Sequence, residues 1–201
     1  HIFHISGLYH KKASPLKEDW ASFVQSSAPH GVVVLSFGTL IAEMSEERAE
    51  MLARVFSRLP QKVIWRFKGP RPASLTNNTW LTEWFPQHDI IAHPLTKVFI
   101  THCGISSTYE AAYNAVPVVA LPLFADQHTN ANKLVRRAKM GVQLDFSTME
   151  EKEFEEALHE VLRNPVYKEN AKQISEQLMD RPLDSKDLLL YVVHHAIRHV
   201  Y

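Results

Sequence analysis

Residues 97–127, KVFITHCGISSTYEAAYNAVPVVALPLFADQ, decide the fold of this 201-residue chain. Two apolar, β-branched runs at 97–101 and 117–121 flank a segment with helical period at 105–114. Neither run alternates strictly between apolar and polar residues, which is typical of strands covered on both faces of a sheet. Strand, helix and strand in this order predict two parallel strands joined by a crossover helix.

The same pattern extends along the chain in both directions. Further buried strands are predicted at 31–35, 62–67, 79–83 and 142–144, with helices at 45–58 and 127–139 and a shorter helical turn at 87–92. This alternation of strands and helices predicts an α/β fold with a Rossmann-like, doubly wound parallel sheet.

The two ends of the chain lack such units. Thr148-x-x-Glu151 has the form of a capping box and predicts the start of an amphipathic helix, and helices at 165–179 and 184–200 follow it. Residues 1–30 are predicted to form a linker and a short lead-in helix. The domain itself, with its C-terminal helices, is therefore predicted over 31–201.

The chain has no net charge, so it has no overall electrostatic field that could attract a charged partner. Lys plus Arg and Asp plus Glu both total 22, so neither nucleic acid nor an anionic membrane surface is an expected partner, and any phosphate site must be local. No run of 18 apolar residues occurs and the first residues lack the apolar core of a signal peptide, so we expect this chain to be soluble. The single Cys103 is expected to pack in the core, and it leaves the redox compartment open.

Three predicted strands end in residues suited to binding, at the edge where open parallel sheets hold their ligands. After the first strand comes Ser36-Phe37-Gly38-Thr39, a small-residue turn that lets a phosphate approach the backbone, although such turns also occur for steric reasons. After 97–101 come His102 and Gly104, and then Ser106 and Ser107 at a helix start. An imidazole, hydroxyls and free N–H groups together predict an anion site, with helix capping as the alternative role of the serines.

Further polar groups lie beside this predicted anion site. Glu110, about one turn into the helix, could accept bonds from vicinal hydroxyls, or it could lie on a solvated face. Asp126 and Gln127 follow the strand at 117–121 and suit a polyhydroxylated ring, although Asp126 could also cap a helix. Trp84 could stack on a flat base with Gln87 near its edge, or it could belong to the core. The combination fits the parts of a nucleotide-sugar.

The spacing of these residues resembles the donor-binding box of the UDP-glycosyltransferase family. The matching residues are Trp84, Pro86, Gln87, His93, Pro94, His102, Gly104, Glu110, Pro117, Pro122, Asp126 and Gln127. Outside the box, segments such as Leu59-Pro60-Gln61-Lys62-Val63-Ile64-Trp65-Arg66-Phe67 and Asn164-Pro165-Val166-Tyr167-Lys168-Glu169-Asn170 are similar to the animal UDP-glucuronosyltransferase branch. The resemblance covers essentially the whole chain and implies the C-terminal half of a GT-B glycosyltransferase.

Carried over by position, the resemblance assigns a role to each site residue. Trp84 would stack on uracil with Gln87 beside it, and Glu110 would hold the ribose. The diphosphate would lie among Ser36, Gly38, His102, Gly104, Ser106 and Ser107, and Asp126 and Gln127 would hold sugar hydroxyls. Two positions depart from the family pattern: Cys103 stands where many animal members have glycine, and Ser106 where asparagine is common.

The resemblance implies an inverting transfer of glucuronate or glucose from the UDP-sugar to a small lipophilic acceptor, with no metal or other cofactor. The catalytic His-Asp pair and the acceptor pocket belong to an N-terminal half absent from this sequence, so we expect no catalytic residue and no turnover in this chain alone. The family also implies an endoplasmic reticulum enzyme facing the lumen, held by a membrane segment absent here, and it allows a homo-oligomer. The alternatives are a non-catalytic nucleotide-binding module and the donor-binding subunit of a split enzyme.

Two motifs remain outside this interpretation. His194, His195 and His199 could suggest a metal cluster on the last helix, but no carboxylate or thiol stands near them in the sequence to complete it. Asn77-Asn78-Thr79 is a sequon, for which a turn made by asparagines is the simpler role and a glycan the alternative. NAD is disfavoured as a ligand because the turn after Ser36 lacks Gly-x-Gly-x-x-Gly spacing.

Overall fold

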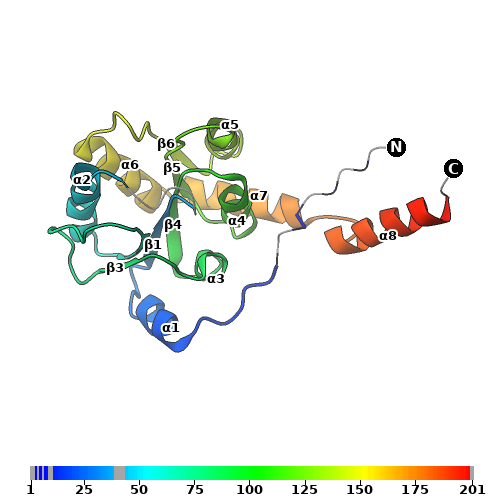
Figure 1. The fold of residues 1–201 in the computed structure, drawn as a ribbon, viewed down its shortest axis with the longest axis horizontal. Helices are drawn as coiled ribbons and strands as arrows, with labels where there is room; N and C mark the ends of the chain where they lie inside the picture. The colour runs from blue at the N-terminus through cyan, green and yellow to red at the C-terminus, as the bar shows by residue number, and fades with distance from the viewer. Residues whose placement is uncertain (1–2, 4, 6, 9–10, 39–43, 200–201) are drawn as a thin grey trace.

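A computed structural model describes residues 3, 5, 7–8, 11–38 and 44–199, which form a six-stranded parallel sheet between two layers of helices (Figure 1). The strands are β1 (Val32–Ser36), β2 (Lys62–Arg66), β3 (Thr79–Thr82), β4 (Thr96–Thr101), β5 (Val118–Ala120) and β6 (Gly141–Gln143). Their order, β3-β2-β1-β4-β5-β6, confirms the predicted doubly wound fold. The strand order reverses between β1 and β4, where this architecture places its ligand crevice.

Side chains of each strand alternate between two buried clusters. In β1, Val33 and Leu35 pack on the side of α2 (Glu46–Ser57) and α6 (Glu151–Arg163), whereas Val32 and Val34 face the opposite layer. That layer contains α1 (Glu18–Gln25), α3 (Gln87–Ile91), α4 (Ile105–Tyr113), α5 (Gln127–Asn132), the π-helix η1 (Lys133–Arg137) and α7 (Pro165–Met179). All five residues of β1 are buried, which explains why its sequence does not alternate.

Two predicted helix boundaries are wrong. The capping box at Thr148 does not start α6, which begins at Glu151 after Glu150 and has no side-chain cap. The backbone N–H groups of Thr148 and Met149 instead donate to the Asp145 carbonyl at 3.3 and 2.9 Å, and Arg48 donates to the Ser147 and Met149 carbonyls. These bonds hold residues 145–149 as a turn, so the helix starts two residues later than the motif predicts.

The predicted helix at 127–139 is also interrupted. After α5, the chain widens into η1, and the Ala138 N–H donates to the Lys133 carbonyl five residues earlier at 2.9 Å. The wider turn of the π-helix changes the direction of the chain. The Met140 N–H then donates to the Leu134 carbonyl, and the edge strand β6 begins at the next residue.

The lead-in helix occurs where it is predicted. In α1, Val24 enters the core, and Trp20 stacks on Trp80 of β3 with ring centroids 4.1 Å apart. The turn before β3 confirms the structural role of the asparagines, because the Asn78 amide donates to the carbonyls of Phe56, Leu59 and Gln61. Asn77 is exposed beside it, and its glycosylation stays a prediction.

The last helix, α8 (Ser185–Arg198), extends away from the sheet (Figure 1). It begins where predicted, since the Asp184 side chain accepts from the Lys186 N–H, whereas Val200 lies outside the described residues. Within the described ranges, every helix is too short or too polar to serve as a membrane-spanning segment. His195 and His199 lie 4.6 Å apart between ring centroids, but the described residues contain no group of three or more His, Cys, Asp or Glu that could hold a metal.

Candidate functional site

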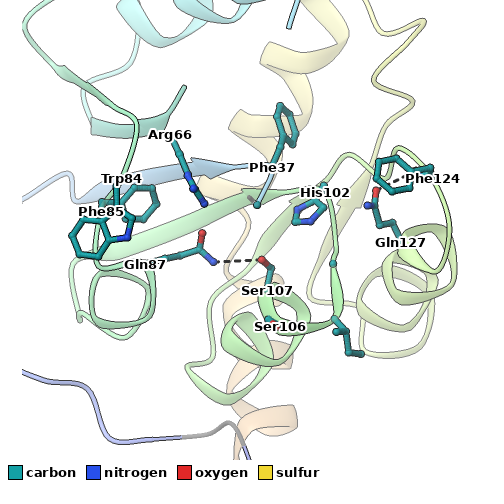
Figure 2. Close-up of a pocket in the computed structure, with 13 residues that line it drawn as sticks. Phe37, Arg66, Trp84, Phe85, Gln87, His102, Ser106, Ser107, Phe124 and Gln127 are labelled. Carbon is teal, nitrogen blue, oxygen red and sulfur yellow. Dashed lines mark hydrogen bonds between the residues drawn. The ribbon is translucent and has the colours of Figure 1, made fainter. Parts of the chain in front are cut away.

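A cavity of about 360 Å³ opens at the carboxyl ends of β1 and β4. It is lined by Phe37, Gly38, Arg66, Trp84, Phe85, Gln87, His102, Gly104, Ile105, Ser106, Ser107, Phe124 and Gln127. Figure 2 shows Trp84, Phe85 and Gln87 at one end, here called the Trp84 end, and Gln127 and Phe124 at the other, with His102 between them. The other half of the cavity runs from His102 to Gln127 and includes Gly38 and Gly104, and it is here called the His102 end. The site thus lies at the point where the strand order reverses.

The His102 end depends on two glycines. Ser36 and Thr101 pair across β1 and β4, which brings the turn after β1 against His102. A Cβ on Gly104 would lie 2.5 Å from His102 Nε2, and one on Gly38 would lie 2.9 Å from the same atom. Gly38 also needs its positive φ of 72°. Both glycines therefore make room for the imidazole, and Ser36 itself is buried, with its hydroxyl accepting from the Gly38 N–H.

Helix α4 presents its amino terminus to the same space. Gly104 is the N-cap, and the first helical bond runs from the Thr108 N–H to the Gly104 carbonyl. The N–H groups of residues 105–107 therefore precede the helical ladder and form a positive pole for an anion. Ser106 and Ser107 line the cavity, and since Gly104 holds the N-cap position, capping does not explain them.

The surroundings of His102 favour the neutral form of the imidazole ring. Burial lowers the pKa of His102, and the nearby Ser36 backbone and Asp126 carboxylate oppose this effect. Its Nδ1 atom is buried with no hydrogen-bond partner among the described residues. An imidazole in this position can take up a proton when an anion enters the cavity.

Cys103 lies between His102 and Gly104 with a φ of 61°, in the left-handed region that glycine favours. Its backbone is fixed on both sides: its N–H donates to Thr101 Oγ1 at 3.1 Å, and its carbonyl accepts from Thr108 Oγ1 and Asn130 Nδ2 at 3.3 and 3.2 Å. Burial raises the pKa of the Cys103 thiol to about 12. The thiol therefore packs as predicted and is not a nucleophile.

The Trp84 end consists of side chains from the β3–α3 connection. Strand β3 ends at Thr82, and Thr82 Oγ1 donates to the Trp84 carbonyl at 2.8 Å. The Trp84 side chain is left 66% exposed, which excludes the core role and makes a ring face available. Gln87, the first residue of α3, donates from Nε2 to Glu110 Oε2 at 2.6 Å, with Ser107 Oγ 3.4 Å away.

Glu110 reaches the site through this bond with Gln87. Burial raises the pKa of the Glu110 carboxyl, and the Gln87 hydrogen bond opposes the shift. A charged, half-buried carboxylate is costly for the fold. The Glu110 carboxylate therefore lies beside the cavity and not on a solvated helix face.

Asp126 and Gln127 are held in different ways at the start of α5. Gln127 is buried, and its Oε1 accepts from the Leu123 and Phe124 N–H groups at 2.9 and 3.1 Å, so the amide nitrogen is the group left for a ligand. Asp126 is exposed, makes no side-chain cap and accepts from Asn130 Nδ2 at 2.8 Å.

The structure brings most predicted site residues together and adds others. Ser36, Glu110 and Asp126 stand next to the cavity without lining it, and Thr39 lies outside the described residues. Sequence reasoning missed Phe37, Arg66, Phe85, Ile105 and Phe124. Arg66 had a detectable signal, because it lies near the end of the predicted strand at 62–67, at the same edge of the sheet as the other three strand ends with polar residues. Its Nε donates to the Glu83 carbonyl at 3.0 Å, and it brings a cation to the cavity.

Comparison with known proteins gives this site its family. A sequence model described as "UDP-glucoronosyl and UDP-glucosyl transferase" matches residues 1–200. The chain belongs to this family. It is 43% identical over 196 residues to UDP-glucuronosyltransferase 2B15 of Homo sapiens and 41% identical over 198 residues to the protein of the same name from Rattus norvegicus. These matches cover 97% and 98% of the chain but 37% of each relative, so the chain spans less than two fifths of their length.

Solved structures of the transferase fold agree with the sheet described above. A crystal structure of Os79 from O. sativa in complex with UDP superposes with a TM-score of 0.70 at 27% identity and covers 80% of this chain and 40% of that one. A UDP-glucosyltransferase from Polygonum tinctorium gives a TM-score of 0.78 at 21% identity over 90% of this chain and 45% of its own, which shows the fold alone. The chain has the fold of one half of a GT-B glycosyltransferase.

Proposed function

We propose that the chain is the UDP-sugar donor-binding domain of an inverting glycosyltransferase. The observation that carries this proposal is the cavity where the strand order reverses, because it combines an exposed aromatic face with an anion site at a helix amino terminus. The family membership of the chain and the UDP complex of a structural relative support the same ligand.

The nucleoside is assigned to the Trp84 end. The exposed Trp84 ring would stack on uracil, and Gln87 would lie beside the base. Glu110 would accept hydrogen bonds from the ribose hydroxyls. The Gln87–Glu110 bond holds both side chains in place relative to each other.

The diphosphate and sugar are assigned to the His102 end. The N–H groups at the start of α4, with His102, Ser106 and Ser107, would surround the diphosphate, and Arg66 adds a local positive charge. Asp126 would accept from sugar hydroxyls and Gln127 would donate to them from its amide nitrogen. The α4 N–H groups, His102 and Arg66 would balance the negative charge of the diphosphate without a metal ion.

The reaction follows from this placement. The acceptor oxygen attacks the anomeric carbon from the face opposite the diphosphate, and the bond from that carbon to the diphosphate oxygen breaks. The electron pair leaves with UDP, where the α4 amino terminus and His102 stabilise it. The acceptor proton passes to a histidine that the family resemblance assigns to the acceptor-binding half, so we expect this chain alone not to turn over.

The finer assignments rest on the family resemblance. Glucuronate and glucose are the proposed sugars, a small lipophilic molecule the acceptor, and the lumenal side of the endoplasmic reticulum membrane the location of the whole enzyme. Arg66 lines the cavity and carries a positive charge. It would favour glucuronate over glucose by pairing with the extra carboxylate of glucuronate.

Calorimetric titration of the purified chain with UDP, UDP-glucuronate, UDP-glucose and NAD tests the proposal. We expect binding of the three uridine nucleotides and none of NAD, and no sugar transfer to a phenol. Binding of NAD, or of none of the four, would favour a different or non-catalytic module, and transfer by this chain alone would contradict the assignment of the base elsewhere.

A further inference from the structure

Asn130 lies between two of the segments that form the His102 end, the β4–α4 turn and the start of α5. It is on α5, one helical turn after Asp126, and its side chain is 2% exposed. Its Nδ2 atom donates to the Cys103 carbonyl at 3.2 Å and to Asp126 Oδ2 at 2.8 Å. One buried amide nitrogen thus bonds to both the β4–α4 turn and the start of α5.

The first of these bonds acts on the turn that carries the anion site. Cys103 is held at a φ of 61°, and its carbonyl accepts from Asn130 Nδ2 of α5 and from Thr108 Oγ1 of α4. The same peptide unit carries the N–H of Gly104, which is the N-cap of α4, so these bonds help to fix the position of the helix terminus. A change at Asn130 therefore alters the aim of the helix terminus as well as the helix that carries Asn130.

The second bond acts on the carboxylate assigned to the sugar. Asp126 is exposed, and without a partner its carboxylate would sample several rotamers. The bond to Asn130 occupies Oδ2 and leaves Oδ1 for a ligand. Because the Asn130 N–H also donates to the Asp126 carbonyl at 2.9 Å, backbone and side chain fix Asp126 together.

We propose that Asn130 is a positioning residue that couples the sugar contact of Asp126 to the anion site beside His102. The proposal rests on the function proposed above for Asp126 and His102. Asparagine suits this role because its amide nitrogen carries two protons, one for each acceptor. Aspartate is nearly isosteric but lacks both donors and would place a second carboxylate against Asp126.

Binding of UDP and UDP-glucose to single and double variants tests the coupling. Asn130→Ala should weaken UDP by about fivefold and UDP-glucose by about tenfold or more, since the second ligand also needs Asp126. Asp126→Ala should add little in the Asn130→Ala background, whereas it should weaken UDP-glucose in the parent chain. Additive losses in this cycle would overturn the proposal.

Two control variants separate positioning from stability. Asn170→Ala removes a partly exposed asparagine that also donates to a carbonyl, that of Lys139 at 2.8 Å, and should leave both affinities unchanged. Thr108→Val removes the other donor to the Cys103 carbonyl, so it should weaken UDP and UDP-glucose by the same factor. If Asn130→Ala behaved like Thr108→Val for the two ligands, Asn130 would only support the turn.

A ligand-free measurement keeps the proposal independent of nucleotide binding. Without ligand and with Asn130 retained, Asp126→Ala should shift the ¹³C carbonyl resonance of Cys103 and speed the exchange of the Asn130 side-chain amide protons. Thr108→Val should leave those amide protons slow. If the parent bound no uridine nucleotide, the proposed function would fail, yet this shift would still support the coupling. An unchanged Cys103 resonance would overturn the coupling, whatever the ligand results.

Discussion

The two ends of the cavity are built in different ways. The Trp84 end consists of side chains from the β3–α3 connection, including an indole that is 66% exposed, and Gln87 is bonded to Glu110 of α4. The His102 end includes two turns with left-handed residues, Cys103 in one and Ala125 in the other. The Cys103 carbonyl accepts from buried Asn130, and the Leu123 and Phe124 N–H groups donate to buried Gln127.

This difference predicts how each end responds to change. Removal of an exposed side chain at the Trp84 end takes away a ligand contact and leaves the fold intact. At the His102 end, backbone groups form the site and side chains hold the backbone, so binding and local structure change together. The variants below test that contrast.

Gly104→Ala should have the largest effect, at the His102 end. The Gly104 φ of −57° suits alanine, so the strain comes only from a methyl group 2.5 Å from His102 Nε2. Displacing the ring into the anion site should weaken UDP by about 100-fold, as measured by calorimetry. His102→Ala in the same chain should recover part of the affinity by freeing the space; no recovery would show that the methyl group acts on something other than the ring.

Trp84→Ala should come second, with a loss of about 30-fold in UDP affinity from stacking and no change in Tm. Trp80→Ala is the matched control, since Trp80 stacks on Trp20 and meets Phe23 edge-on. It should lower Tm and leave UDP affinity almost unchanged. The comparison of the two ends would break if Trp84→Ala lowered Tm as Trp80→Ala does, or if both variants bound UDP equally well.

Glu110→Gln should weaken UDP by about fivefold to tenfold through the loss of a charged acceptor for the ribose. The empty protein should nevertheless become more stable at pH 7. Because burial raises the folded-state pKa of Glu110, its contribution to stability is present below the unfolded pKa and is lost as pH rises through the folded pKa. Glutamine avoids that loss and can still accept from Gln87. Thermal melts of both proteins at pH 4 and pH 7 give the check: the gain in Tm should appear at the higher pH only.

His102 should give the smallest effect, a few-fold change of affinity with pH. Burial lowers its pKa in the empty site, and a bound diphosphate should raise it, so binding takes up a proton between the two values. UDP-glucose affinity should therefore rise as pH falls through the bound-state pKa and level off below the free-state pKa. Titrations in buffers of different ionisation enthalpy measure the proton uptake, which should vanish in His102→Phe.

Much of the fold was predictable because buried parallel strands leave continuous apolar runs, as in β1 and β4. Strand and helix ends were harder. The capping motif at Thr148 fails because a distant side chain, Arg48, holds the turn before α6, and no local pattern contains that bond. The π-helix after α5 likewise depends on the pairing of β6 with β5, which is a tertiary contact that no local pattern contains.

The site was predictable where its residues are contiguous along the chain and not where the fold gathers them. His102, Gly104 and Gln127 follow strands closely and line the cavity as predicted. Phe37 and Phe124 read as ordinary apolar residues, and only the structure shows that they face the ligand space. The carbonyl oxygen of Gln127 is already used by two backbone N–H groups, so its predicted role narrows to that of a donor.

A crystal structure of the chain with UDP tests the central claim most directly. The account predicts uracil against the exposed ring of Trp84 and the diphosphate against the N–H groups at the start of α4, beside His102. Density for the nucleotide at any other place on the sheet edge, or a diphosphate pointing away from α4, would contradict it.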